Sequence, residues 1–337
     1  MPNRRYRGAI IGLGGIARNG HLPGFLRRQG DAARLAIVAC VDPAATDTAV
    51  GGIPVVRSLA DLDRFGPLDF VDVCTPTASH VELSIWALER GLHVLCEKPV
   101  AVSGAEAETL AAAARRVGRV LMPCHQYRFN PAWLQLKKWL EAGRIGAWRL
   151  AEFQVYRQEA DRGSAQAVVP WRAQREQSRG GIVLDHGTHL IYEMLDVAGP
   201  PSSVQAWTTR LRHQDYDVED TAQIVLQYPD KMGVLFLTWA GHHRETRIRF
   251  VGELGWLEWR GGILEASTEG SYDRLDFASQ LDKASYADWF SGLFGAFARA
   301  MDAGGPDEAS LDDLTQVALV LGAIYDAPDR SLLPMTA

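Results

Sequence analysis

Residues 9–17 of the chain read Ala-Ile-Ile-Gly-Leu-Gly-Gly-Ile-Ala, a short apolar run that leads directly into a glycine turn. This order predicts a first β-strand, a tight turn and the start of a helix, which is the setting of a dinucleotide-binding fingerprint. Gly12 permits the turn, Gly14 lets the backbone approach a pyrophosphate, and the unpaired N–H groups of the helix N-terminus suit its negative charge. A glycine-rich loop without a ligand is the alternative. We expect four residues here to bind the cofactor: Gly12, Gly14, Gly15 and Ile16.

Asp42 directly follows the second predicted strand, Leu35–Val41. A carboxylate at this strand end can accept hydrogen bonds from both ribose hydroxyls of an adenosine, and it would repel a 2′-phosphate. We therefore expect NAD rather than NADP as the cofactor, with a solvated capping aspartate as the alternative. Asp42 lies 30 residues after Gly12, a longer spacing than usual, which we attribute to residues 19–31. There Pro23 is expected to interrupt the first helix and let a second short one begin.

Apolar runs and helical stretches alternate over the first part of the chain, which predicts buried parallel strands with helices between them. Ser79 with Glu82, and Ser103 with Glu106, have the spacing of a capping box at a helix start. Such repeated units predict a doubly wound α/β sheet, and we assign residues 1–122 to a dinucleotide-binding domain. The predicted strands are Ala9–Ile11, Leu35–Val41, Val55–Val56, Leu68–Cys74, Leu92–Cys96 and Val120–Met122.

The pattern changes after Pro123, where strand-like segments follow one another with only turns between them. Strands joined by turns predict an antiparallel sheet, so we expect residues 123–337 to form a second, α+β domain. Helix 311–325 is a candidate for packing back on the first domain. The predicted helices of this part are 132–142, 187–198, 287–303 and 311–325. The predicted strands are Trp148–Arg157, Val204–Arg212, Thr221–Tyr228, Gly233–Trp239, Thr246–Val251 and Trp256–Trp259.

Length and composition limit the classes to which the protein can belong. Its 337 residues suggest two domains, and 47% hydrophobic with 23% charged residues indicates a folded protein. A net charge of −6 without a basic block argues against nucleic acid as a partner, and no apolar run approaches the ~20 residues that span a bilayer. The cysteines lack zinc-site spacing, so we expect buried thiols, no metal and a cytoplasmic location. They are Cys40, Cys74, Cys96 and Cys124.

Three further segments distinguish this chain from dinucleotide-binding proteins in general. They are Cys74-Thr-Pro-Thr-Ala-Ser-His80, Cys96-Glu-Lys-Pro-Val-Ala101 and Gly180-Gly-Ile-Val-Leu-Asp-His-Gly-Thr-His-Leu190. Together with the glycine turn they resemble the Gfo/Idh/MocA family, which contains glucose-fructose oxidoreductase and inositol dehydrogenase. The resemblance spans essentially the whole chain. It implies a Rossmann domain followed by an α+β domain with a large, open, mostly antiparallel sheet, and an active site between them. Family members mostly oxidise or reduce a secondary alcohol or ketone on a sugar or cyclitol with NAD(P).

The resemblance also implies roles for individual residues. Lys98 would lie near the nicotinamide and the reacting carbon, and the peptide bond between Lys98 and Pro99 would be cis. Asp185 and His189 match the family's catalytic acid and histidine. From the motifs and from their positions after predicted strands, further residues are expected on the cofactor side: Thr75, Pro76, Thr77, His80, Glu97 and Lys98.

Elementary chemistry supports these roles, because ligands of such folds bind at the carboxyl ends of parallel strands. Hydride transfer from an alcohol leaves a hydroxyl proton, and an imidazole such as His189 can take it near neutral pH. Lys98 can stabilise the developing alkoxide with its ammonium group. If the segment is helical, Asp185 shares a face with His189 and can orient it or bind a substrate hydroxyl. His186 and His189 form H-x-x-H, but without cysteine partners at zinc spacing we expect no metal.

The substrate is expected to contact the second domain and the junction before it. Residues 125–131 resemble the family's junction motif, but Gln126 and Tyr127 stand where Asn and Arg are common. For Tyr156, an exposed or interface aromatic residue is an equal alternative. The expected substrate-binding residues are Gln126, Arg128, Tyr156, Trp171, Arg172 and His186.

An open sheet that carries several tryptophans would expose apolar area if it were left uncovered. These residues are Trp207, Trp239, Trp256 and Trp259. We therefore expect a homodimer or homotetramer through this sheet, with burial inside the monomer as the alternative.

The combined prediction is an NAD-dependent dehydrogenase or ketoreductase that acts on a secondary hydroxyl of a sugar, cyclitol or related polyol. Its expected partners are this small-molecule substrate and further copies of itself, with neither nucleic acid nor membrane. One alternative is an NAD-dependent glycosidase that uses transient oxidation. A second is a nucleotide-sensing binding protein without chemistry, against which the presence of Lys98, Asp185 and His189 argues.

Overall fold

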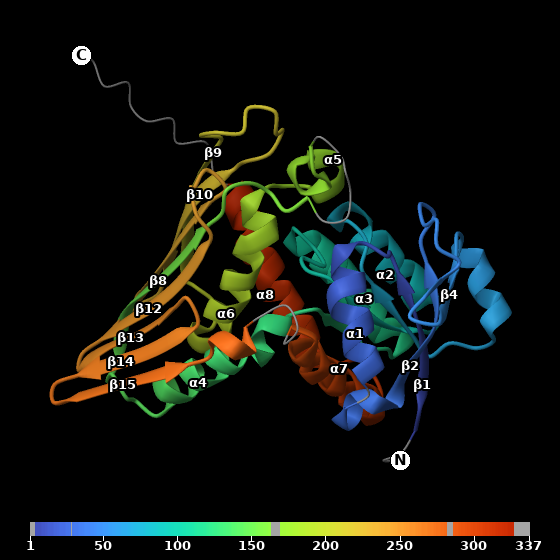
Figure 1. Ribbon diagram of the computed structural model, residues 1–337, viewed down its shortest axis with the longest axis horizontal. Coiled ribbons are helices and arrows are strands. Elements are labelled where there is room, and N and C mark those ends of the chain that lie inside the picture. Colours follow the sequence, from blue (N-terminus) through green and yellow to red (C-terminus); the bar gives the residue numbers. More distant parts are fainter. Residues whose placement is uncertain (1–3, 28, 163–168, 282–285, 327–337) are drawn as a thin grey trace.

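The computed structural model describes residues 4–27, 29–162, 169–281 and 286–326, and its strands form two separate sheets. Figure 1 shows the sheets on opposite sides of the molecule, with α6 and α8 in the space between them. Within the described residues, every helix is too short or too polar to cross a membrane. The helices are α1 Leu22–Arg27, α2 His80–Glu89, α3 Gly104–Val117, α4 Pro131–Glu141, α5 Arg175–Ser178, α6 Thr188–Ala198, α7 Tyr286–Ala303 and α8 Glu308–Tyr325.

The first sheet has seven strands in the order β3-β4-β2-β1-β5-β6-β7. All its pairs are parallel except β3 with β4. This confirms the predicted doubly wound sheet, in which the order changes direction beside β1, the place where such folds bind their ligands. The strands are β1 Tyr6–Ile11, β2 Leu35–Val41, β3 Ala49–Val50, β4 Ile53–Val56, β5 Phe70–Val73, β6 His93–Cys96 and β7 Leu121–Pro123.

The helix after the glycine turn continues through its proline. A π-turn, Ala17–His21, runs directly into α1, so Pro23 lies inside the helical segment. The expectation that Pro23 interrupts this helix is therefore wrong. The Leu22 N–H group bonds to the Ala17 carbonyl, so the helix widens immediately before the residue that has no N–H group to donate.

Only one of the two serines of the predicted capping boxes caps its helix. The Ser103 hydroxyl accepts the Glu106 N–H group at 3.4 Å at the start of α3. Ser79 does not cap α2; its hydroxyl donates to Thr75 Oγ1 at 2.7 Å and to the Pro76 carbonyl at 2.9 Å. Ser79 therefore stabilises the turn that follows β5, because its hydroxyl finds closer acceptors there.

The second sheet has eight strands in the order β15-β14-β13-β12-β8-β11-β10-β9. Only β8 with β11 is parallel, which confirms the mostly antiparallel sheet. Strands β14 and β15 are not among the predicted strands. Most residues of β15 are exposed, so it lacks the alternation of a half-buried strand. The strands are β8 Trp148–Tyr156, β9 Ser203–Thr209, β10 Thr221–Gln227, β11 Met232–Thr238, β12 Glu245–Gly252, β13 Gly255–Arg260, β14 Ile263–Thr268 and β15 Ser271–Asp276.

Helices α4 and α6 cover the face of the second sheet that points toward the first (Figure 1). Trp133 of α4 packs against Phe153 of β8 in the core between them. The tryptophans of the second sheet lie on both of its faces. Trp239 and Trp259 are buried in this core, whereas Trp207 is 42% exposed on the outer face.

The last two helices join the sheets. On α7, Phe294 stacks on Phe25 of α1 at 3.8 Å, and Phe297 meets Phe70 of β5 edge to face. Helix α7 therefore completes the core of the first sheet. Helix α8 packs against α3 on one side and α6 on the other. The division of the chain after residue 122 remains a prediction.

Candidate active site

Lys98 and Asp185 bring the two parts of the chain into contact. Lys98 comes two residues after β6, and Asp185 lies in a π-turn, Val183–Gly187, that leads into α6. The Lys98 ammonium group donates a hydrogen bond to the Asp185 carbonyl oxygen, and its Nζ lies 3.5 Å from Oδ1 of the carboxylate. The peptide bond between Lys98 and Pro99 is cis, as expected. The carboxyl edge of the first sheet thus faces the start of α6.

Asp185 is the centre of a cluster of basic groups. Arg172 Nε lies 3.3 Å from its Oδ1, and His186 Nδ1 lies 3.2 Å from its Oδ2. Burial alone would raise the pKa of Asp185, but His186, Lys98 and Arg172 together hold it well below its usual value. The Arg172 guanidinium stacks on Trp171 at 4.6 Å. Asp185 is therefore ionised at neutral pH and can hold two cations beside the site.

His189 follows Asp185 by one turn, but its Nδ1 bonds to the Tyr192 hydroxyl at 2.8 Å. Its ring stacks on Tyr127, with the centroids 4.0 Å apart. Burial, helped by the charge of Lys98, lowers the pKa of His189 well below its usual value. The imidazole is therefore neutral at neutral pH and can accept a proton. Tyr192, rather than Asp185, orients the ring.

Tyr192 and Tyr127 are site residues that sequence reasoning did not identify. The Tyr192 hydroxyl accepts the backbone N–H group of Tyr127 at 3.1 Å, and the Tyr192 ring stacks on His125 at 4.1 Å. A signal for Tyr192 was present, because it lies three residues after His189 on a predicted helix, where side chains are neighbours.

Two of the expected substrate residues contact other parts of the protein. Arg128 donates to both carboxylate oxygens of Asp313 at 2.7 Å, and to the Tyr192 carbonyl at 3.0 Å. These bonds tie α8 to α6. Gln126 is only 1% exposed. Arg128 is thus held by protein groups and Gln126 is buried, and contact of either residue with the substrate stays a prediction.

Tyr156 lies on the outer face of the second sheet. Its neighbour Val155 is buried under the helices, and successive strand residues point to opposite faces. The Tyr156 ring contacts Phe236 and His243 on that outer face. The structure therefore does not bring Tyr156 to the cluster around Asp185, and the interface alternative remains open.

The glycine turn has the shape that a dinucleotide requires. Gly12 has a φ of +93°, and a Cβ atom there would lie 2.9 Å from the Cys74 carbonyl carbon. A Cβ atom on Gly14 would meet nothing within 4 Å, so the space beyond it is open. The Asp42 carboxylate accepts the Leu13 N–H group at 2.8 Å, which fixes it beside the turn. These residues fit NAD, with the turn and the following helix start for its pyrophosphate and Asp42 for a ribose. The helix start contains Gly15 and Ile16.

His80 joins two turns of the first domain. Its Nε2 lies 2.8 Å from the Thr75 carbonyl oxygen and its Nδ1 lies 2.8 Å from the Pro99 carbonyl oxygen. The side chain is buried, so His80 holds the turn 75–77, which includes Pro76 and Thr77, against Lys98. A direct contact of His80 with the cofactor stays a prediction.

Glu97 points into the first domain. It is 6% exposed, and its carboxylate oxygens meet His21 Nε2 at 2.8 Å and the Lys98 N–H group at 3.1 Å. Glu97 therefore lies beneath Lys98, and its expected contact with the cofactor stays a prediction.

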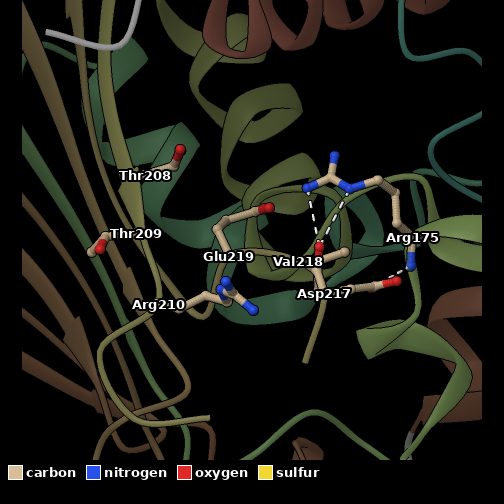
Figure 2. A pocket seen from close by; sticks show the side chains of 7 residues that line it. All are labelled: Arg175, Thr208, Thr209, Arg210, Asp217, Val218 and Glu219. Atoms are coloured by element: carbon tan, nitrogen blue, oxygen red, sulfur yellow. Dashed lines mark hydrogen bonds between the residues drawn. The ribbon is translucent and has the colours of Figure 1, made fainter. Parts of the chain in front are cut away.

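Glu219 anchors the π-turn that carries Asp185. Its Oε1 accepts the N–H groups of Gly181 at 2.9 Å and Val183 at 3.2 Å, and the Tyr325 hydroxyl at 2.7 Å. A Cβ atom on Gly181 would lie 1.9 Å from the Glu219 carbonyl oxygen, so only glycine fits. Figure 2 shows Glu219 in a pocket beside β9. The other lining residues are Arg175, Thr208, Thr209, Arg210, Asp217 and Val218.

Tyr192→Phe is expected to lower kcat about tenfold or more, because the substitution removes the hydroxyl that orients His189. The phenylalanine ring can still stack on His125. Steady-state kinetics measures this change, and the dissociation constant of NADH should stay unchanged. Tyr228→Phe is the matched control, since it removes a hydroxyl that bonds to the Gly199 carbonyl beyond the other end of α6. Wild-type turnover in Tyr192→Phe would show that the hydroxyl does not orient the base.

Comparison with known proteins places this site in a family. Residues 6–125 match the model described as oxidoreductase family, NAD-binding Rossmann fold, and residues 133–258 match that of the GFO/IDH/MocA C-terminal domain. The uncharacterized oxidoreductase YdgJ of Escherichia coli is 28% identical over 283 residues, which are 84% of this chain and 77% of that protein. The scyllo-inositol 2-dehydrogenase (NADP+) IolW of Bacillus subtilis is 27% identical over 182 residues, 54% of this chain and 49% of that enzyme.

Solved structures share the fold along nearly the whole chain. Levoglucosan dehydrogenase in complex with NADH and levoglucosan superimposes with a TM-score of 0.81 at 21% identity, covering 96% of this chain and 97% of that one. The two family models together match more than half of the residues, one for each sheet. The chain therefore belongs to the Gfo/Idh/MocA family of NAD-binding oxidoreductases.

Proposed function

We propose that this oxidoreductase interconverts a secondary alcohol and a ketone on a sugar, cyclitol or related polyol. The observation that carries the proposal is the contact of Lys98 with Asp185, at the start of the helix that bears a neutral His189. The names of similar proteins support the substrate class, because one is a scyllo-inositol dehydrogenase and another was solved with levoglucosan.

NAD, held by the glycine turn and Asp42, would supply the hydride acceptor for the alcohol carbon. His189 takes the hydroxyl proton on Nε2, the ring nitrogen that does not contact Tyr192. The Lys98 ammonium group stabilises the negative charge that develops on the same oxygen. Asp185 keeps Lys98 and Arg172 in place, and in the reverse direction His189 returns the proton.

Lys98→Ala and His189→Ala are each expected to lower turnover about 100- to 10,000-fold while NADH still binds, because each removes a positioned acid–base or electrostatic group. A panel of inositols, aldoses, keto sugars and levoglucosan is screened first by absorbance of reduced cofactor. Net NADH accumulation separates a dehydrogenase from a glycosidase that oxidises only transiently.

The exposed Lys138→Ala is the matched control for this experiment. A variant that keeps most of its turnover removes that residue from the mechanism.

The low pKa of His189 also predicts the pH dependence of the wild-type enzyme. As the pH falls, kcat for alcohol oxidation should decrease only below about pH 6.5, because the base stays neutral down to that pH.

NADH is expected to bind more tightly than NADPH. The Asp42 carboxylate can accept hydrogen bonds from the hydroxyl groups of the adenosine ribose, whereas it would repel a 2′-phosphate. Asp42→Ala should weaken NADH binding about tenfold or more, since it also releases the Leu13 N–H group. Fluorescence titration measures both constants. Asp47→Ala, which breaks an ion pair with Arg18 near the same turn, is the control. Tighter binding of NADPH would overturn the cofactor preference.

We also propose that a second copy of the chain covers the outer face of the second sheet. That face exposes Trp207 and Met232 and carries the half-buried Tyr156 and Trp256. Light scattering is expected to give the mass of a dimer or tetramer of the 37.1 kDa chain, and Trp207→Glu should weaken the assembly. A monomer at micromolar concentration would contradict this.

A further inference from the structure

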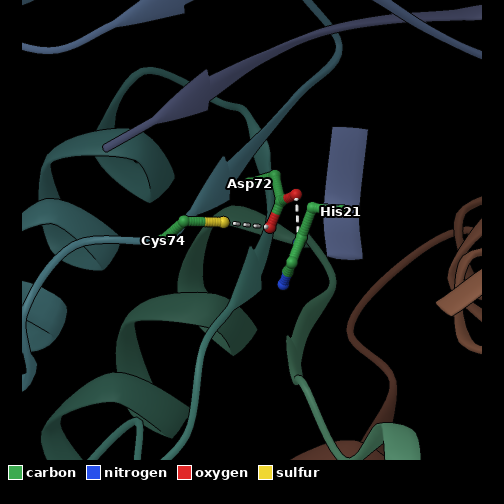
Figure 3. Close-up of side chains that lie close together, drawn as sticks. All are labelled: His21, Asp72 and Cys74. Carbon is green, nitrogen blue, oxygen red and sulfur yellow. Dashed lines mark hydrogen bonds and ion pairs between the residues drawn. The ribbon is translucent and has the colours of Figure 1, made fainter. Parts of the chain in front are cut away.

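A buried group of charges lies directly beneath Lys98. His21 Nδ1 is 2.6 Å from Asp72 Oδ2, and His21 Nε2 is 2.8 Å from Glu97 Oε1. His21 and Asp72 are 0% exposed, and Glu97 is 6% exposed. Figure 3 shows the His21 ring directed at the Asp72 carboxylate, with Cys74 on the other side of that carboxylate. No step of the proposed reaction uses this group.

His21 is the cation of this cluster. Each of its ring nitrogens faces a carboxylate oxygen, and only the doubly protonated ring can donate to both. Burial opposes this charge, but Asp72 and Glu97 outweigh it and raise the pKa of His21 to about 10. The rings of Phe290 and Phe294 pack against His21 with centroids 4.3 and 5.8 Å away. In this apolar setting the imidazolium binds both carboxylates firmly.

The three charged residues come from separate elements. His21 ends the π-turn that follows the glycine turn, Asp72 lies on β5, and Glu97 directly follows β6. One carboxylate oxygen of Glu97 bonds to His21 and the other accepts the backbone N–H group of Lys98 at 3.1 Å. A chain of hydrogen bonds therefore runs from the cofactor-binding helix to the backbone of the lysine at the site.

The same side chains do not make a good metal site. Ligand atoms of His21, Asp72 and Cys74 lie within 4.8 Å of one another, as do those of His21, Glu97 and Cys124. Both ring nitrogens of His21 already face carboxylates. Burial raises the pKa of Cys74 and Cys124 well above its usual value, so both remain thiols, which are poor ligands.

We propose that His21 is a positioning residue, whose contact with Glu97 fixes the backbone of Lys98 and couples the position of its ammonium group to the helix after the glycine turn. The role of Lys98 in this statement rests on the proposed function. The placement of Lys98 does not, and it can be measured without cofactor or substrate.

The first experiment follows Lys98 in the protein without NAD. The chain has five lysines, so reductive ¹³C-methylation gives a simple NMR spectrum in which Lys98→Ala assigns the Lys98 signal. His21→Gln is expected to shift that signal, because Glu97 loses its cationic partner. His93→Gln is the matched control, since His93 begins β6 at the opposite end of the strand and accepts the Val120 N–H group. An unchanged Lys98 signal in His21→Gln would overturn the proposal.

The second experiment needs no variant that could fail to fold. In wild-type protein labelled with ¹⁵N-histidine, both ring nitrogens of His21 should carry protons at about pH 8, where an ordinary histidine is neutral. A neutral His21 ring at that pH would equally overturn the proposal.

The third experiment uses turnover of the polyol found by the screen. His21→Gln and Glu97→Gln are each expected to lower kcat about tenfold or more with little change in KM, because a small displacement of Lys98 misaligns it. The double variant should lose no more than Glu97→Gln alone, since the two residues act in series. Additive losses would mean that His21 acts by another route. If no polyol reacts, the proposed function fails while the NMR experiments still decide the placement of Lys98.

Discussion

The contact of the Lys98 ammonium group with Asp185 joins two sheets that have separate cores, and the charge state of the whole site depends on it. Asp185 stays ionised because Lys98, Arg172 and His186 surround it. The same ammonium group helps to keep His189 neutral. A buried ion pair of this kind adds little to the free energy of folding. Its value here is that the same ammonium group favours both the ionised form of Asp185 and the neutral form of His189.

Parts of the fold with local signals could be predicted from sequence. The apolar run before Gly12 and the turn after it form β1 and the start of a helix, and Asp42 stands at the end of β2. The π-turn before Pro23 could not be predicted, because a change in helix width leaves no mark on composition. The mostly exposed strand β15 also carries no hydrophobic alternation, so its residues resemble a loop.

For the site, the motifs located the chain segments but not the direction of each side chain. Lys98 and Asp185 were expected in one site and do meet. Glu97, next to Lys98, turns the other way, into the interior. Arg128 finds its partner 185 residues further along the chain, on α8. Spacing reveals neighbours within one helix or strand, whereas such distant partners depend on how the whole chain packs.

The aromatic core of the first sheet is built from both ends of the chain, because Phe25 and Phe70 pack against α7. On the ribosome, residues 6–125 emerge first, and α7 begins at Tyr286. At about 5–20 residues per second, roughly 10 to 30 seconds of translation separate them. During that interval Phe25 and Phe70 lack the α7 side chains against which they pack in the finished fold, so the first sheet completes its core only late in synthesis.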